Sequence, residues 1–302
     1  MRPIQAAAFE QAIAKPRLDS YRGYFHANLE EAIGLYMWNM ELSSCLSALL
    51  CHFEIALRNN VHRSMSQFYS RGTTSSIHWY DQIAHQLTPT LRDKLSDVRR
   101  RHRGGAPGPG PDEMVSRLTF GFWPGVIGRI DRRYVDQLLP SIFPHHALNA
   151  SPAKWRAGAS RLAALAYLNE FNTMRNRLAH HEPVWKFAPV QDPATSPTHR
   201  LPGTVDLPTS LARFARLLAQ YDAGIDSLNR DLAQDIATSS WRQRMNFLLS
   251  VRAVERYRQG KHVPAAPISP ATFRRSFDHL IRNNQIVVIA GGVKYRGIFT
   301  PG

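Results

Sequence analysis

Apolar residues recur at helical spacing along one long segment in the first quarter of the chain. The steps between them are seven, four, three, four and four residues, which fits an amphipathic helix. The residues on this stripe are Leu35, Leu42, Leu46, Leu49, Phe53 and Leu57. The pattern predicts a helix from about Asn28 to Met65, and the Gly, Ser and Thr residues of Ser70–Ser76 predict a loop after it.

A second stripe in the C-terminal half is narrower and more regular. Its apolar residues alternate steps of three and four residues. They are Leu211, Phe214, Leu218, Tyr221, Ile225, Leu228 and Leu232. This seam predicts one long helix that packs against another helix, either inside a bundle or across a dimer interface.

A third helix is predicted between these two. Ser151 and Pro152 suit an N-cap and a first turn, and apolar residues continue from Trp155 to Leu178. The helix should end near His181 or Glu182, because the residue before a proline disfavours the α region. Shorter helices are expected at Ala6–Ala14, around Leu91–Val98 and from residue 111 or 112, with an aromatic turn at Phe120–Gly125.

Linkers divide the chain. Residues 99–111 combine arginines with a Gly/Pro stretch and predict a mobile loop, and the proline-rich residues 187–208 predict a connection. After Gly260 we expect a helix from Ser269 to Ile281 and a β-hairpin over Ile286–Phe299. The predicted fold class is all-α: a helical domain over residues 1–240 and a small helix-and-hairpin extension over residues 241–302.

Charge indicates the kind of partner. The 302 residues carry a formal net charge of +15, which attracts polyanions: nucleic acid first, and an anionic membrane as the weaker alternative. We expect neither a signal peptide nor a membrane-spanning helix. Cys45 and Cys51 lie six residues apart on one predicted helix, so they should be unpaired core residues of a cytoplasmic protein.

The chemistry concentrates in the segment 171–183. Asn172, Asn176 and His180 are spaced by four residues and share one helix face, with Arg175 on its edge. A guanidinium binds phosphate oxygens through two parallel hydrogen bonds, and an imidazole exchanges protons near neutral pH. In RNA the neighbouring 2′-hydroxyl is itself a nucleophile, so this set suits phosphodiester cleavage without a metal or other cofactor.

Three ordered segments resemble the Abi-like family of abortive-infection proteins, a branch of the HEPN superfamily. The main one is Arg175–Pro183, in which Arg175, Asn176 and His180 match the arginine, polar residue, three variable residues and histidine of HEPN ribonucleases. The other two segments are Leu35–Asn39, continuing to Asn59, and Leu118–Trp123. The resemblance covers roughly residues 20–235.

The resemblance implies a helical bundle that dimerises and cleaves RNA to a 2′,3′-cyclic phosphate without a metal. Arg175 would stabilise the phosphorane, His180 would act as acid or base, and Asn176 would orient substrate or His180, while His181 and Glu182 support the site. The chain would be a toxin-like effector of phage defence, with RNA, a second copy and an antitoxin or RNA regulator as partners. The alternatives are a non-catalytic RNA-binding or regulatory module, and a DNA-associated protein that uses its C-terminal hairpin.

Other polar groups have two interpretations each. One polar stripe on the first long helix consists of Glu54, Arg58 and His62. It is interpreted either as an intrahelical ion pair followed by a terminal histidine, or as a site wall in which Glu54 and Arg58 face Arg175. A run of arginines is either a solvated cluster or an RNA-gathering patch. It consists of Arg99, Arg100, Arg101 and Arg103. The residues around His180 lack the spacing of a zinc site. Trp38 and Trp123 are interpreted as core residues, and His145 and His146 as surface residues.

Overall fold

A computed structural model of the chain describes residues 3–103, 108–191, 200–261, 265–283, 286–291 and 295–299. It is 70% helical and 5% strand, so the all-α class is confirmed. The helices are α1 (Pro3–Ile13), α2 (Lys15–Phe25), α3 (Leu29–Tyr69), α4 (Trp79–Gln82), α5 (Pro89–Arg100), α6 (Pro111–Arg117), α7 (Phe122–Ile127), α8 (Val135–Ile142), η1 (Ala147–Ala150), η2 (Pro152–Arg156), α9 (Gly158–Leu165), α10 (Tyr167–Ala179), α11 (Leu207–Leu228), α12 (Arg230–Thr238), α13 (Ser240–Leu248), α14 (Val251–Arg258) and α15 (Pro270–Arg282). The strands are β1 (Val190–Gln191), β2 (Arg200–Leu201), β3 (Ala265–Ile268), β4 (Val287–Gly291) and β5 (Tyr295–Phe299).

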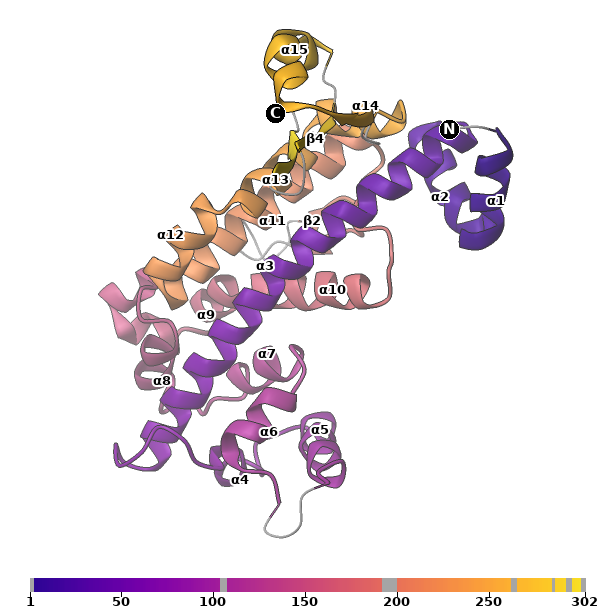
Figure 1. Ribbon diagram of the computed structural model, residues 1–302. Coiled ribbons are helices and arrows are strands. Elements are labelled where there is room, and N and C mark those ends of the chain that lie inside the picture. The colour runs from indigo at the N-terminus through magenta and orange to yellow at the C-terminus, as the bar shows by residue number, and fades with distance from the viewer. Residues whose placement is uncertain are drawn as a thin grey trace.

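The 41-residue helix α3 runs diagonally through the whole molecule and organises it (Figure 1). Asn28 and Glu31 start it with a reciprocal capping box, as the predicted boundary at Asn28 requires. All six residues of its predicted apolar stripe are buried. Helices α1 and α2 lie at one end of α3, and α4, α5 and α6 lie near the other, while α11 to α13 run along its flank.

Helix α3 also contains an 18-residue window of mean hydropathy 1.3, long and apolar enough by length and composition to cross a membrane. This match alone does not overturn the expectation that the chain has no membrane-spanning helix. One such helix is weak evidence, because the core helix of a soluble protein meets the same criterion.

The third predicted helix is in fact interrupted. Residues 152–156 form a 3-10 turn around the buried Trp155, α9 follows, and a bend at Ala166 separates α9 from α10. Ser151 makes no side-chain cap at this start. The expected aromatic turn at Phe120–Gly125 is largely helical, because Phe122 and Trp123 open the short helix α7.

The second predicted helix also breaks, at Asn229. This residue has extended backbone, and its side chain caps the first turn of α12 through a 2.8 Å hydrogen bond from the Leu232 N–H. The seam is intramolecular over much of its length, because α11 packs on α3, α10 and α12. Helices α13 and α14 pack on α3 as well, with Trp38 Nε1 donating to the Leu248 carbonyl at 2.8 Å. The boundary expected at residue 240 therefore falls inside the helical body.

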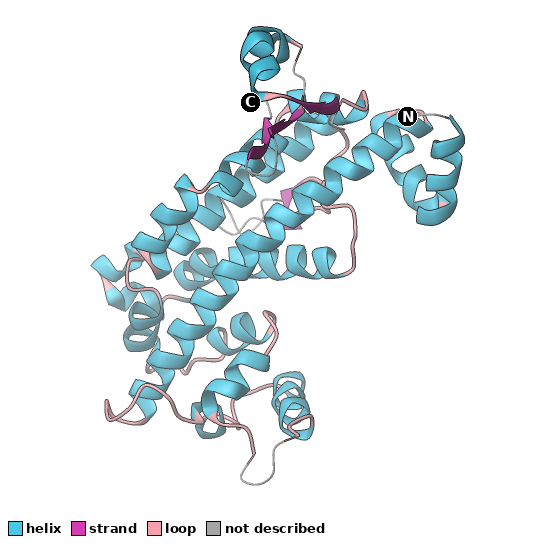
Figure 2. Cartoon of the chain, in the orientation of Figure 1, coloured by secondary structure: helices cyan, strands magenta, loops and turns pink. Residues whose placement is uncertain are grey.

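The C-terminal residues form a small three-stranded sheet with one helix, as Figure 2 shows. Strands β4 and β5 pair antiparallel, and β3, which the sequence pattern did not indicate, pairs parallel to β4. Helix α15 begins at the cap Ser269 and places Phe273 and Phe277 at 5.0 and 5.5 Å from Phe299. These ring contacts hold the helix on the sheet.

Several individual expectations need correction. Both cysteines are free, but only Cys45 is partly buried, and Cys51 is exposed. His146 is partly buried beside Trp155 rather than on the open surface. Trp38 and Trp123 are fully buried, which confirms their core interpretation. Of the two predicted linkers, residues 104–107 and 192–199 lie outside the described residues, and residues 190–191 and 200–201 pair as strands.

Candidate active site

Helix α10 carries the predicted catalytic motif and is anchored by its apolar face. The Phe171 ring lies 4.9 Å from Phe53 on α3 and 6.1 Å from Tyr221 on α11. Met174 is buried on the same side. The polar stripe is turned away from this core, with Asn172 partly buried and Asn176 exposed.

The two histidines are displayed where α10 ends. His180 is the C-cap residue, its N–H donates to the Asn176 carbonyl at 3.0 Å, and its side chain is exposed. His181 has the left-handed backbone conformation (φ 53°) and turns the chain out of the helix. Its carbonyl accepts a 2.6 Å hydrogen bond from Arg17 Nη1 on α2. The backbone at this end is therefore fixed, while both imidazoles are exposed to solvent.

Arg177, a variable position in the motif, shapes this turn. Its side chain donates to the Pro183 carbonyl and pairs with Glu182 at 3.6 Å. Burial lowers the pKa of Arg177, and the Glu182 carboxylate opposes that shift. Glu182, expected to support catalysis, thus makes its described ion pair with a structural arginine.

The chain beyond the turn is held by aromatic packing. Trp185 is fully buried, with ring centroids 5.2 Å from Tyr21, 4.3 Å from Tyr24 and 5.0 Å from Phe25. The Val184 N–H donates to Asn39 Oδ1 of α3 at 2.9 Å. These contacts hold the end of the motif against α2 and α3.

Arg175 lies among charged side chains from other helices. Burial raises the pKa of Glu54 on α3, and the positive charges of Arg175 and Arg58 oppose that shift. Burial also lowers the pKa of Lys94 on α5, and the charge of Arg175 lowers it further. Among the described residues, Arg175 makes no hydrogen bond or ion pair of its own, so its guanidinium is available to a ligand.

Lys94 approaches α10 across a glycine. A Cβ on Gly121 would lie 3.1 Å from Asn172 Oδ1 and 3.3 Å from Lys94 Nζ. Without a side chain at residue 121, both polar groups come close to this backbone. Sequence reasoning missed Lys94, because a lysine on a polar helix is ordinary until the fold brings α5 beside α10.

Arg58 contributes a second partly satisfied guanidinium. Its Nη1 donates to the Ser116 carbonyl at 3.5 Å, and its Nε is shielded from solvent without an acceptor. Glu54 and Arg58 form no ion pair with each other among the described residues, so their intrahelical pairing is not seen. Because the charges of Arg175 and Arg58 both act to lower the pKa of Glu54, the three side chains belong to one charged cluster.

His62 lies outside this charged cluster. Its Nδ1 accepts a 2.9 Å hydrogen bond from Trp79 Nε1, and its Nε2 is 3.1 Å from Asp112 Oδ1. Burial lowers its pKa. The expected intrahelical ion pair ending on His62 is therefore replaced by a buried structural contact.

Arg175 and His180 occupy opposite edges of one polar face. Five residues at about 100° each place them about 140° apart around the helix axis, with Asn172 and Asn176 between them. The Arg175 edge lies toward Lys94 and Glu54, and the His180 edge lies at the exposed end of the helix. Because of this separation, the two side chains of one helix point in different directions.

The predicted RNA-gathering arginines divide into two pairs. Arg99 binds Asp81 at 2.7 Å, and Arg100 binds Asp97 at 2.5 Å. Arg101 and Arg103 are exposed, with no side-chain partner among the described residues. Only the latter two have their full charge available to a polyanion.

Within the described ranges, no group of three or more His, Cys, Asp or Glu side chains is placed to hold a metal ion. Comparison of the chain with protein-family models, with curated proteins and with solved structures finds no match. The resemblance to the Abi-like family therefore rests on the three sequence segments alone.

Proposed function

We propose that this chain is a metal-independent endoribonuclease of the HEPN type, acting in the cytoplasm as a toxin-like effector of abortive infection. The observation that carries the proposal is the unpaired Arg175 guanidinium beside Lys94, on the same helix face as the exposed His180. Two adjacent cations without a matching pair of anions favour a bound phosphate. An exposed imidazole on the same face supplies proton exchange.

The reaction follows from these roles. The ribose 2′-oxygen forms a bond to phosphorus, the bond from phosphorus to the 5′-oxygen breaks, and a cyclic phosphate and a 5′-hydroxyl result. Arg175 and Lys94 stabilise the charge that develops on the phosphorane oxygens. His180 takes the proton from the 2′-hydroxyl or gives one to the leaving 5′-oxygen. Asn176 orients the substrate, and Glu54 orients Arg175 by attraction.

A second copy of the chain would complete the site. Because Arg175 and His180 point to different edges of one helix, two facing motifs would place the arginine of one protomer near the histidine of the other. Equimolar mixing of Arg175→Ala and His180→Ala chains tests this arrangement. Partial recovery of cleavage supports a composite site, and a fully active isolated monomer contradicts it.

Cleavage of single-stranded RNA in EDTA tests the activity. Wild-type protein should cut the RNA, and His180→Ala should cut at least 100-fold more slowly, because a general acid or base contributes at least about this much. His145→Ala, which changes an exposed histidine elsewhere, should retain wild-type activity. The separation of about 140° between Arg175 and His180 also favours a second function. If the two side chains do not meet at one phosphate, the chain would bind RNA without cutting it. Tight binding by a wild-type protein that never cuts would establish that alternative.

A further inference from the structure

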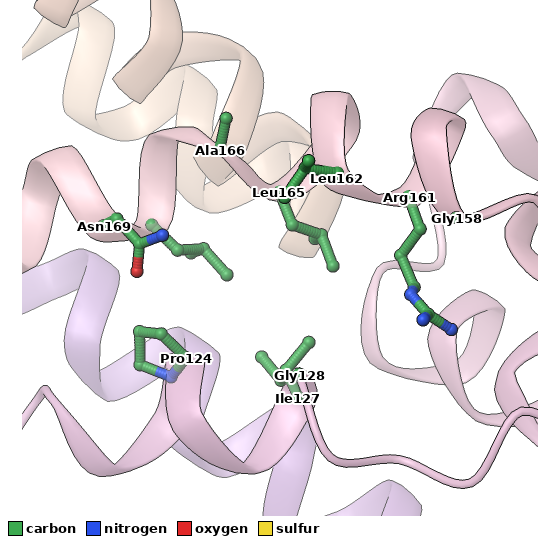
Figure 3. Close-up of a pocket in the computed structure, with 10 residues that line it drawn as sticks. Pro124, Ile127, Gly128, Gly158, Arg161, Leu162, Leu165, Ala166 and Asn169 are labelled. Atoms are coloured by element: carbon green, nitrogen blue, oxygen red, sulfur yellow. The ribbon is translucent and has the colours of Figure 1, made fainter. Parts of the chain in front are cut away.

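A pocket of about 320 Å³ lies between α7 and the junction of α9 with α10. Leu162 and Leu165 face Pro124 and Ile127 across it, and Arg161 and Asn169 lie at opposite ends (Figure 3). Leu162 is 63% exposed, so this wall of the pocket is open to solvent. The pocket is a slot with two apolar walls and a polar group at each end.

The charge of the slot is positive and unbalanced. Arg161 makes no side-chain hydrogen bond or ion pair among the described residues, and its Nη1 is shielded from solvent without an acceptor. None of the residues that line the pocket is Asp or Glu. A partly buried guanidinium without acceptors carries a desolvation cost that a ligand with two adjacent acceptors would offset.

The pocket and the Arg175 site share the same two helices. On α10, Asn169 lines the pocket and Asn172 lies three residues on, about 4.5 Å along the axis. At α7, Gly121 lies beside Asn172 and Lys94, and Pro124 lines the pocket. Asn172 and Gly121 therefore lie between the pocket and Lys94.

We propose that this pocket binds the base of the nucleotide whose phosphate occupies the Arg175 site, and that Arg161 selects guanine. The proposal rests on the RNA-directed function proposed above. Apolar side chains enclose a base by its flat faces. Arg161 lies at the end away from the phosphate site and offers only donors, which match the O6 and N7 acceptors of guanine, whereas adenine presents a donor beside its N7.

Binding of the four nucleoside 3′-monophosphates to the full chain tests the pocket without any cleavage. Isothermal titration should give guanosine 3′-monophosphate about tenfold tighter binding than the adenosine compound. Arg161→Gln should remove this preference, and Arg161→Lys, which keeps the charge but loses the planar fork, should weaken it. Arg129→Gln, an exposed arginine next to the pocket residue Gly128 but outside the lining, should keep the preference.

Hydrogen exchange locates the ligand. Guanosine 3′-monophosphate should protect residues 124–128 and 158–169 in the wild type. An unchanged base preference in Arg161→Gln, or protection elsewhere, overturns the inference. The two proposals can fail independently. Guanine-selective binding without RNA cleavage would support the base-binding pocket and contradict the ribonuclease function. RNA cleavage without a base preference would support the ribonuclease function and contradict the guanine pocket. If Arg161→Gln does not fold, Arg161→Lys decides the question.

Discussion

Lys94 and Arg175 are two cations from different helices that lie close enough for the guanidinium charge to lower the pKa of the lysine, in addition to the larger lowering by burial. Like charges brought together in a partly buried site weaken the folded chain and create a place for an anion. Glu54 provides the nearby negative charge, but burial raises its pKa and so disfavours its ionised form. A phosphate diester would balance the site better than this single carboxylate.

Lys94→Gln should lower the affinity for single-stranded RNA about tenfold, because it removes one charge-assisted phosphate contact. Fluorescence anisotropy with a labelled oligonucleotide measures this change. The matched control is Lys186→Gln, which removes an exposed lysine from the chain beyond the motif. Equal losses in the two variants would show that Lys94 contributes only net charge.

The stability of the chain should also depend on Lys94 in alkaline solution. The folded pKa of this group lies below its ordinary value of about 10.4, so the unfolded chain binds more protons between the two values. Stability therefore gains a contribution as pH rises through that window. Urea unfolding between pH 8 and 10.5 should show this contribution in the wild type and not in Lys94→Gln. Identical pH profiles would place Lys94 in open solvent.

Periodicity could predict much of the helical body but not where helices break. The α3 stripe is long and its capping box is local, so both the helix and its start could be read from sequence. Asn229 interrupts a seam that continues in phase on both sides, and the interruption depends on a cap whose geometry only the fold shows. Strand β3 was missed because its parallel partner lies across the intervening helix α15.

The candidate site divides in the same way. The motif residues on α10 share one helix, so their spacing alone predicted a common polar face. Lys94 comes from another element, and only tertiary packing brings it to Arg175. Glu182 is an opposite example. The sequence motif predicted that it supports catalysis, but in the folded chain it pairs with Arg177, which holds the turn.

Arg175→Ala and Arg177→Ala should separate function from structure on one helix. Arg177 is largely buried and holds the turn, so its loss should reduce the free energy of unfolding by about 1.5–3 kcal/mol. Arg175 lacks such partners, so its loss should leave stability within about 0.5 kcal/mol and abolish RNA cleavage. Chemical denaturation and activity assays on the pair measure both effects. A large stability loss in Arg175→Ala would make that residue structural.

The basic run should act through free arginines only. Removing Arg101 and Arg103 together should reduce the slope of log affinity against log salt by about 1.4, since each contact to a single strand contributes about 0.7. Arg99→Ala should change the slope less, because Asp81 already neutralises Arg99 in the folded chain. RNA binding measured across a salt series gives these slopes. If the double substitution leaves the slope of log affinity against log salt unchanged, Arg101 and Arg103 do not contact the RNA phosphates.

The most direct measurement is the chemistry of the cut ends in EDTA, made on one RNA and on the same RNA with a single 2′-deoxy nucleotide at the cleavage position. The wild-type chain should leave a 2′,3′-cyclic phosphate and a 5′-hydroxyl, and should spare the deoxy-substituted bond. Arg175→Ala and His180→Ala should leave both RNAs intact. Cleavage of the deoxy-substituted bond, or full activity without Arg175 and His180, would contradict the account.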